Sequence, residues 1–326
     1  MMENEIIELS IIVPIYNVEK YLKQCLDSIY KIENIKKEII LVNDGTEDGS
    51  GKIISDYKER YKEVTEIVEK KNGGLSSARN SGFKKARGKY VYFIDSDDYL
   101  DSEKFEKFFS NTKTKEVDIL VGGLNFFYDD SDEVVENKYN KKLFKNNEIA
   151  GLEFLKESVK LKSFNVSVWT NVYKKEFLIE NNIDFKEKLL HEDYIFTLKA
   201  FCQAKKVYVS NNNFYFYRKR SGSITANLNF KNFIHLCYTL NYLLDYIKKE
   251  NINNVGLNEI LCSLYLKVLV KGKIYSFLLL KKLIEYTFPK NMKIRFRILV
   301  SLIISVFRKF YNGRNLENEN FNSWGL

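Results

Sequence analysis

Three carboxylates and a hydroxyl follow directly after a short apolar run. The run is Tyr90–Ile94, and the polar residues are Asp95, Ser96, Asp97 and Asp98. Neighbouring carboxylates repel one another and are costly to desolvate unless a cation lies among them. Because residues two apart in an extended chain face the same side, Asp95 and Asp97 are expected to point together, an arrangement of oxygen ligands that suits Mg²⁺ or Mn²⁺. An acidic turn that merely ends a strand is the alternative for so short a motif.

The elements that position these acids follow from the alternation of apolar patterns. Short apolar runs predict strands over residues 9–13, 38–42, 64–68 and 90–94, with helices predicted over 18–30, 51–61 and 75–87. This alternation is typical of βαβ units and a parallel sheet. Ligands bind where the carboxyl ends of such strands emerge, and here those ends carry Tyr16 and Asn17, Asn43 and Asp44, and Asp95–Asp98. The acidic group is therefore expected to serve a ligand.

Beyond residue 100 the strict alternation stops. A helix is predicted over 102–109, strands over 117–127 and 133–139, a helix over 147–160, and strands over 207–210 and 214–217. His191, Glu192 and Asp193 precede a further helix that ends near residue 202, and from residue 230 the pattern is helical with a break over 251–256. Since no repeat or low-complexity linker divides the chain, we expect one merged domain with a helical appendage.

Composition indicates a folded protein of 326 residues, 45% of them hydrophobic and 15% aromatic. The four cysteines form no C-x-x-C pair, which predicts reduced thiols in a cytosolic protein. The first dozen residues lack the basic start and apolar run of a secretory signal. No stretch reaches the roughly 18 apolar residues that a membrane-spanning helix needs.

The net charge of +9 is concentrated near the C-terminus, where residues 265–315 hold twelve Lys or Arg against Glu285 alone. Within them the ten-residue apolar run Ile298–Phe307 is bracketed by basic residues. It is too short to span a bilayer, and it fits a helix lying on an anionic membrane surface. A helix packed on the body with a solvated basic edge is the alternative. Nucleic acid is not expected, because no recognised binding module is present.

Several familiar sites are excluded by their missing residues. The chain has neither G-x-x-x-x-G-K-[ST] nor G-x-G-x-x-G, which argues against P-loop hydrolysis and dinucleotide oxidoreduction. The segment 44–55 imitates a calcium loop but ends in Ser55 instead of Glu. His191 has no second histidine one helical turn on, as a zinc protease would require.

Four sequence blocks in order carry a more specific signal: SIIVPIYN at 10–17, LVNDGTEDGS at 41–50, NGGLSSARNSGFKKARGKYVYFIDSDDYL at 72–100 and HEDYIFTLKA at 191–200. Together they resemble family 2 glycosyltransferases of the GT-A fold, the bacterial group that builds capsule, exopolysaccharide and lipopolysaccharide chains. The resemblance implies an α/β fold, with a mixed, mainly parallel sheet flanked by helices. It implies a catalytic domain over 1–225, comprising a nucleotide-sugar half (1–100) and an acceptor half (101–225), before a basic helical region (226–326).

The resemblance also assigns roles at the donor site. Tyr16 would stack on the nucleotide base and Asp44 would accept a base N–H, with Pro14 fixing the turn that exposes them. Arg79 would meet the diphosphate or a carboxylate of the site, although a solvated surface arginine is the alternative. Asp97 would coordinate Mg²⁺ or Mn²⁺, and Asp95 would hold the ribose or the metal's water shell. Further donor-binding residues implied are Asn17, Asn72, Gly73 and Ser96.

On the acceptor side, Asp193 is the implied general base, since inversion by direct displacement needs a proton acceptor for the attacking hydroxyl. A helix cap is the alternative for an Asp at a helix start. Glu192 and His191 would orient the acceptor or tune the base. Trp169 and Tyr173 would form an acceptor wall, with core packing as the alternative. Arg218, Arg220 and Ser223 resemble a loop that closes over the diphosphate, and exposed basic residues without a role are the alternative.

The function implied is transfer of a sugar, most simply from a UDP-sugar, to a hydroxyl of a growing glycan. A lipid-linked oligosaccharide acceptor at the inner face of the cytoplasmic membrane would suit the basic tail, making the enzyme cytoplasmic and peripheral to the membrane. A non-catalytic nucleotide-sugar-binding subunit is one rival. A nucleotidyltransferase is another, but it would ordinarily carry a basic, Gly-rich loop after the first strand.

Overall fold

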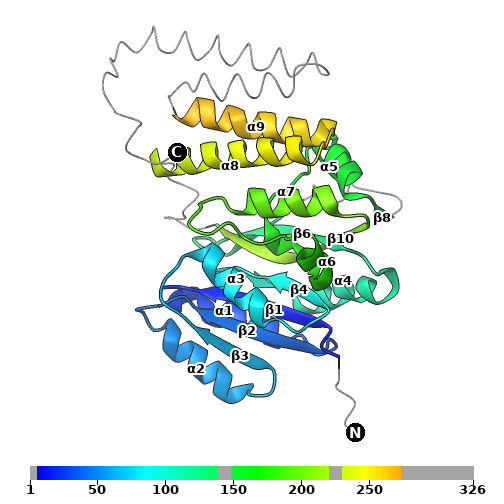
Figure 1. Ribbon diagram of the computed structural model, residues 1–326. Coiled ribbons are helices and arrows are strands. Elements are labelled where there is room, and N and C mark those ends of the chain that lie inside the picture. Colours follow the sequence, from blue (N-terminus) through cyan, green and yellow to red (C-terminus); the bar gives the residue numbers. More distant parts are fainter. Residues whose placement is uncertain (1–5, 138–147, 220–229, 273–326) are drawn as a thin grey trace.

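One mixed sheet runs through the part of the protein that the computed structural model describes, residues 6–137, 148–219 and 230–272 (Figure 1). Its strands are β1 (Leu9–Ile15), β2 (Lys37–Asn43), β3 (Thr65–Glu69), β4 (Tyr90–Phe93), β5 (Tyr99–Leu100), β6 (Ile119–Tyr128), β7 (Glu133–Glu136), β8 (Glu148–Ile149), β9 (Asn171–Lys174) and β10 (Val207–Lys219). The strand order is β3-β2-β1-β4-β9-β6-β10-β5, with β7 paired to β6 and β8 to β10.

Parallel pairing holds β3, β2, β1 and β4 together, and β6 is parallel to β10. Strand β9 runs antiparallel to both of its neighbours, β4 and β6, and so joins the two parallel groups. The chain reverses its direction of travel across the sheet at β1, because β2 lies on one side of it and β4 on the other. Loops diverge at such a switch point and leave a place for ligands.

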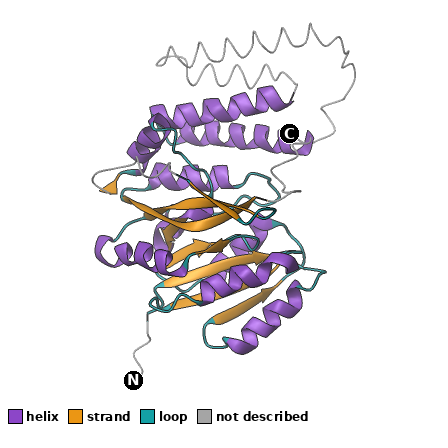
Figure 2. Ribbon diagram, turned by 180° about the vertical axis from the view of Figure 1, so that it is seen from behind, coloured by secondary structure: helices purple, strands orange, loops and turns teal. Residues whose placement is uncertain are grey.

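Helices cover both faces of the sheet (Figure 2). They are α1 (Glu19–Tyr30), α2 (Ser50–Arg60), α3 (Leu75–Lys85), α4 (Ser102–Lys115), α5 (Gly151–Lys160), the 3₁₀ turn η2 (Val168–Thr170), α6 (Lys175–Glu180), α7 (Asp193–Gln203), α8 (Phe230–Lys249) and α9 (Val255–Gly272). Side chains alternate along β1, so Ile11 belongs to the apolar cluster that includes residues of α1 and α4, whereas Ile12 belongs to the cluster that includes residues of α3 and α7. With both faces covered, β1 is buried along its whole length.

Helices α8 and α9 lie beside each other, with α8 above α7 and with α9 in contact with α5 (Figure 1). Leu236 and Leu240 of α8 and Leu261 of α9 belong to the same apolar core as Phe196 of α7. The first part of the C-terminal region is therefore packed into the body, and the expected boundary at residues 225 and 226 lies outside the described residues. In the described part of the chain, no helix has the length and apolarity needed to cross a bilayer.

The predicted mixed, mainly parallel α/β sheet is confirmed, and its first four strands lie where the apolar runs placed them. Two later predictions were wrong in detail. The predicted helix over 147–160 begins only at Gly151, after the short strand β8. The two strands predicted at 207–210 and 214–217 are one strand, β10, whose pairing with β6 is interrupted by bulges around Asn213. All four cysteines lie within the described residues, and none of them forms a disulfide.

Candidate active site

The carboxyl ends of β1, β2 and β4 meet where β4 separates from β1. The ladder between β1 and β4 ends at the pair Ile12 and Phe93. Ile94 makes the last hydrogen bond between these strands by donating its N–H to the Ile12 carbonyl at 3.1 Å. Pro14, expected in a turn, lies inside β1 and is paired with Val42 of β2. Residues two apart in a strand direct their backbone groups to the same neighbour, so Pro14 faces the β4 side, where its missing N–H costs no ladder bond. Pro14 therefore helps to end this ladder. Beyond it the chain leaves the sheet as the acidic loop, Asp95–Asp98.

The loop after β1 is tied to the loop after β2 by Asn17. Its N–H donates to Thr46 Oγ1 at 2.9 Å, and its Oδ1 accepts from the Glu47 N–H at 2.9 Å. Asn17 has a φ of 50°, a left-handed conformation that Asn tolerates better than most residues. Tyr16, directly before it, is 45% exposed, so its ring remains accessible for stacking.

Asp44 holds the loop that leads into α3. Its buried carboxylate accepts from the N–H groups of Gly73 at 2.9 Å and Gly74 at 2.8 Å, and from the Lys70 ammonium. Gly74 has a φ of 82°, which a residue with a side chain rarely adopts. Asn72 and Gly73 are exposed at this loop. The contact of Asp44 with a base N–H, implied by the resemblance, stays a prediction, because here the carboxylate is engaged by the loop.

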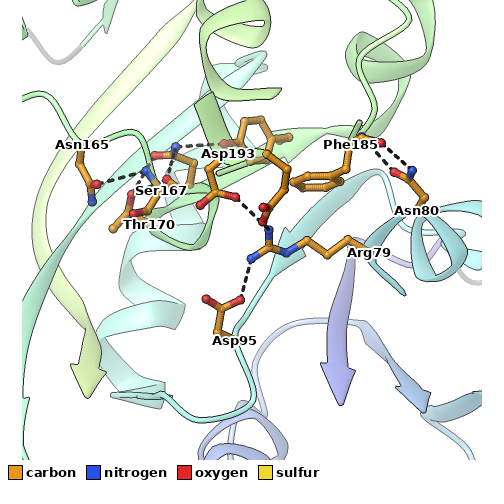
Figure 3. Close-up of polar contacts among 11 residues, drawn as sticks. Arg79, Asn80, Asp95, Asn165, Ser167, Thr170, Phe185 and Asp193 are labelled. Atoms are coloured by element: carbon orange, nitrogen blue, oxygen red, sulfur yellow. Dashed lines mark hydrogen bonds and ion pairs between the residues drawn. The ribbon is translucent and has the colours of Figure 1, made fainter. Parts of the chain in front are cut away.

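Arg79 of α3 brings three carboxylates from distant parts of the sequence to one point (Figure 3). Its Nη2 donates to Asp95 Oδ1 at 2.7 Å, and its Nη1 donates to Glu192 Oε1 at 2.7 Å and to Asp193 Oδ1 at 2.9 Å. The guanidinium side chain is 1% exposed, whereas the Asp193 side chain keeps 20% of its surface exposed. Of the two partners expected for Arg79, the structure shows the carboxylates, and the surface alternative is wrong.

The guanidinium also packs against the ring of Phe185, whose centre lies 5.0 Å from its central carbon. Phe185 stacks on Phe196 of α7 at 4.1 Å. Asn80, the next residue on α3, donates its Nδ2 to the Phe185 carbonyl at 2.8 Å and accepts the Phe185 N–H at 3.0 Å (Figure 3). Helices α3 and α7 are therefore locked together around Arg79.

Burial and neighbouring charges determine the pKa values of the ionisable groups in this cluster. Desolvation raises the pKa of Asp193 to about 7, the Arg79 guanidinium opposes that rise, and neighbouring Glu192 adds to it. Desolvation likewise raises the pKa of Asp95 to about 6, with contributions from Asp97 and Asp193 and opposition from Arg79. The pKa of Arg79 is raised, because its three carboxylate partners outweigh desolvation. A carboxyl group with a pKa near neutrality is suited to exchange protons with a substrate.

Asp193 is the first residue of α7, and the residue in the cap position is Glu192, which makes no capping hydrogen bond through its side chain. The Asp193 carboxylate faces Arg79. The helix-cap alternative for Asp193 is therefore wrong.

Residues of β10 anchor the acidic loop through hydrogen bonds. Asp98, which is buried, accepts from the Tyr215 hydroxyl at 2.6 Å and from the Arg218 N–H at 2.7 Å. Arg218 donates its Nε to the Asp97 carbonyl at 2.7 Å and its Nη1 to Asp129 at 2.6 Å. The expected diphosphate role of Arg218 is wrong for this structure, since its side chain is buried in strand β10 and engaged by these groups. Arg220 and Ser223 lie outside the described residues.

The acidic loop fits one divalent cation shared with a substrate. Asp97 is partly exposed at the end of β4, and its charge raises the pKa of Asp95, so the two carboxylates are electrostatically coupled. One Asp95 oxygen is engaged by Arg79. No group of three or more His, Cys, Asp or Glu residues able to hold a metal occurs within the described ranges. A cation bound through Asp97 would need further oxygen ligands from a diphosphate and water, as Mg²⁺ commonly takes them.

Three of the predicted contact residues lie in the interior. Trp169 is buried and stacks on Tyr215 at 4.3 Å, and Tyr173 is fully buried and accepts from Asn171 Nδ2 at 3.0 Å. The acceptor wall expected from these two rings is wrong, and their core alternative holds. Ser96 is also buried. His191 is partly buried directly before Glu192, in a left-handed conformation with φ of 62°.

Sequence reasoning missed the residues that support the site. Asp98 stood in the acidic group but received no role, and Asn80 stood next to Arg79 in the block at 72–100. Phe185 had no signal, because its contacts with Asn80 join positions 105 residues apart. An amide that bonds a distant backbone leaves no local pattern.

Comparison with known proteins identifies the family of this chain. The family model for glycosyl transferase family 2 matches residues 10–177. The uncharacterized glycosyltransferase EpsJ of Bacillus subtilis is 37% identical over 221 residues, which are 66% of this chain and 62% of EpsJ. The chain thus spans less than two thirds of that relative's length.

Two solved structures share the fold. S. aureus TarS 1-349 in complex with UDP-GlcNAc matches with a TM-score of 0.63 and 23% identity, over 86% of this chain and 79% of that 1-349 chain. The mannosyltransferase PcManGT from Pyrobaculum calidifontis, in complex with GDP-Man and Mn2+, matches with a TM-score of 0.57 and 12% identity, over 94% of this chain and 83% of its own. The expected GT-A fold is confirmed. With its four sequence blocks, its sheet and the family match over more than half its length, the chain belongs to glycosyl transferase family 2.

Proposed function

We propose that this protein transfers a sugar from a nucleotide-sugar donor, a UDP-sugar, to a hydroxyl of a glycan acceptor with inversion at the anomeric carbon. The observation that carries the proposal is the Arg79 cluster, in which the acid at the end of β4 and the two acids at the start of α7 share one guanidinium. Donor-side and acceptor-side groups must lie this close for a direct displacement.

Asp193 would act as the general base. Its carboxylate is partly exposed and its pKa is raised to about 7, so near neutral pH it accepts a proton from an acceptor hydroxyl as the hydroxyl attacks. The Arg79 bond orients the Asp193 carboxylate through its Oδ1. Glu192, less exposed and bonded to the same guanidinium nitrogen, would tune Asp193.

On the donor side, Asp97 would hold a divalent cation, Mg²⁺ or Mn²⁺, which when bound neutralises charge on the departing nucleoside diphosphate. Arg218 and Tyr215 fix the loop that carries Asp97. The exposed ring of Tyr16 would stack on the base, with Asn72 and Gly73 lining the same edge. Support for UDP and for the metal comes from the TarS and PcManGT complexes, which share the fold.

The acceptor is proposed to be a growing cell-surface glycan carried on a lipid at the inner face of the cytoplasmic membrane. Support comes from the twelve basic residues between 265 and 315, which would draw the enzyme to an anionic surface. Most of them lie outside the described residues.

The test is a panel of UDP-, GDP- and dTDP-sugars, scored for nucleotide release by the purified chain with and without EDTA. We expect release from a UDP-sugar that EDTA abolishes and that added Mn²⁺ or Mg²⁺ restores. Release from none of the sugars, with or without metal, would favour a non-catalytic nucleotide-sugar-binding role.

A further inference from the structure

The chain contains two histidines, and the structure brings both to the segment that precedes Asp193. His191 belongs to that segment. His235 lies on α8, 45 residues from its partner, and its Nδ1 accepts the backbone N–H of Leu190 at 2.8 Å. A backbone N–H can only donate, so Nδ1 of His235 must be the unprotonated ring nitrogen.

The segment that donates this bond is strained. Lys188 and His191 have φ values of 60° and 62°, in the left-handed region that few residues other than Gly adopt, and Lys188 is not one of the types, Asn, Asp and His, that are enriched there. Such residues persist only where their surroundings hold them. The side chain of Glu192 makes no capping bond for α7, so the helix start gains no hold from that source.

Two groups therefore hold the start of α7 from opposite sides. Arg79 holds the side chains of Glu192 and Asp193 from α3, and His235 holds the backbone of Leu190 from α8. Helix α8 is firmly seated, because Leu236, adjacent to His235, and Leu240 pack in the core with residues of α7. A shift of the strained segment would move the Asp193 carboxylate, and displacement by about 1 Å can lower a rate about 100-fold.

We propose that His235 is a positioning residue for the general base. By accepting the Leu190 N–H, it fixes the strained segment and with it the place of Asp193 beside Arg79. The C-terminal region thus contributes to the acceptor side of the site through α8. This inference rests on the proposed role of Asp193, and it concerns a residue beyond the segment that the family model matches.

The experiment compares His235→Asn with His235→Gln in the full chain. Asn carries an amide oxygen near the position of Nδ1 and so keeps an acceptor for Leu190, whereas the longer Gln side chain carries its oxygen farther out. Gln is the better helix former, so a purely structural role of this position in α8 predicts that Gln does better than Asn.

We expect His235→Asn to keep kcat within about threefold of wild type, and His235→Gln to lower kcat at least about tenfold with the donor KM unchanged. Hydrogen–deuterium exchange of the peptide spanning residues 188–194 gives a second readout that needs no turnover: exchange should quicken in the Gln variant only. Equal behaviour of the two variants in exchange and kcat, or a greater loss in Asn, would overturn the inference. A wild-type chain without turnover but with this exchange pattern would instead count against the proposed function.

Discussion

Arg79 is the residue on which the site's electrostatics depend. One guanidinium serves three carboxylates, so the cluster keeps excess negative charge when all are ionised. Removing one partner from a buried ionic group leaves uncompensated charge and commonly costs about 3–5 kcal/mol. Desolvation, to which this excess of negative charge adds, explains why the pKa values of Asp95 and Asp193 are about 6 and about 7 instead of near 4.

Replacing Arg79 with Met is expected to lower the free energy of unfolding at neutral pH by about 3–5 kcal/mol, because three carboxylates lose their cation. Urea unfolding measures the change. Lys85→Met on the same helix is the control, since its pair with Glu66 is exposed and 3.9 Å long and such pairs contribute about 0–1 kcal/mol. Equal effects of the two substitutions would contradict the role assigned to Arg79.

If Asp193 is the general base, as proposed, its ionisation sets the pH dependence of turnover. As a base it must be ionised, so kcat is expected to rise with pH through about 7. Replacing Glu192 with Gln removes a charge that raises the pKa of Asp193, so the rising limb should move to lower pH. Initial rates at saturating donor between about pH 5 and 9 check this. A limb that stays in place or moves upward would count against Asp193 as the titrating base.

The contribution of Asp193 to the free energy of unfolding changes with pH in the opposite direction to turnover. In the folded chain Asp193 holds its proton up to about pH 7, whereas in the unfolded chain it loses the proton near its ordinary pKa of about 4. Between those values the folded state binds more protons, so the contribution of Asp193 to the free energy of unfolding falls as pH rises through this window.

Among the elements, α3 decides where Arg79 stands, and Gly82 decides how closely α3 approaches the sheet. A Cβ at Gly82 would lie 2.5 Å from Ile12 Cγ2 and 3.0 Å from Val42 Cγ2, so any side chain there must push the helix away from β1 and β2. Arg79 lies three residues earlier on the same helix and would move with it.

We expect Gly82→Ala to lower the free energy of unfolding by about 1–3 kcal/mol and to reduce kcat as well, because overpacking displaces α3. Gly51→Ala in α2 is the matched control. Its Cβ would meet only Thr46 Cγ2, at 3.8 Å, so the change should stabilise the protein by up to about 1 kcal/mol through helix propensity. Thermal unfolding compares the two, and a neutral Gly82→Ala would contradict the close contact between α3 and the sheet.

The elements also show how far the sequence could predict this molecule. The four strands of the first half could be found because each is a short, mostly apolar segment between polar loops, and the loops after β1, β2 and β4 meet as parallel topology requires. The roles of Arg218, Trp169 and Tyr173 could not be found. A basic or aromatic side chain looks the same in a linear sequence whether it faces a ligand or the core, and contacts such as Arg218 with Asp97 join residues 121 positions apart.

For the whole molecule, the C-terminal region has two parts with separate roles. Helices α8 and α9 share the core of the body, and we propose that the basic residues beyond residue 272 contact an anionic membrane surface. A chain ending at residue 225 should therefore fail to unfold cooperatively, because the core loses Leu236, Leu240 and Leu261.

A chain ending at residue 272 should keep turnover on a soluble acceptor and lose binding to vesicles that contain anionic lipid. Vesicle sedimentation measures binding, with neutral phosphatidylcholine vesicles as the control for charge. If the shortened chain bound anionic vesicles as well as the full chain does, the basic tail would not be the membrane contact.

The most direct measurement of the central claim is turnover and UDP binding by Asp193→Asn beside wild type. Asn has nearly the shape of Asp but cannot accept the acceptor's proton, and general-base catalysis commonly contributes about 10²–10⁴-fold. The account predicts a loss of kcat in that range, with the affinity for UDP and Mn²⁺ measured by calorimetry unchanged. Turnover retained in Asp193→Asn with intact UDP binding would contradict the claim that the Arg79 cluster holds the general base of this enzyme.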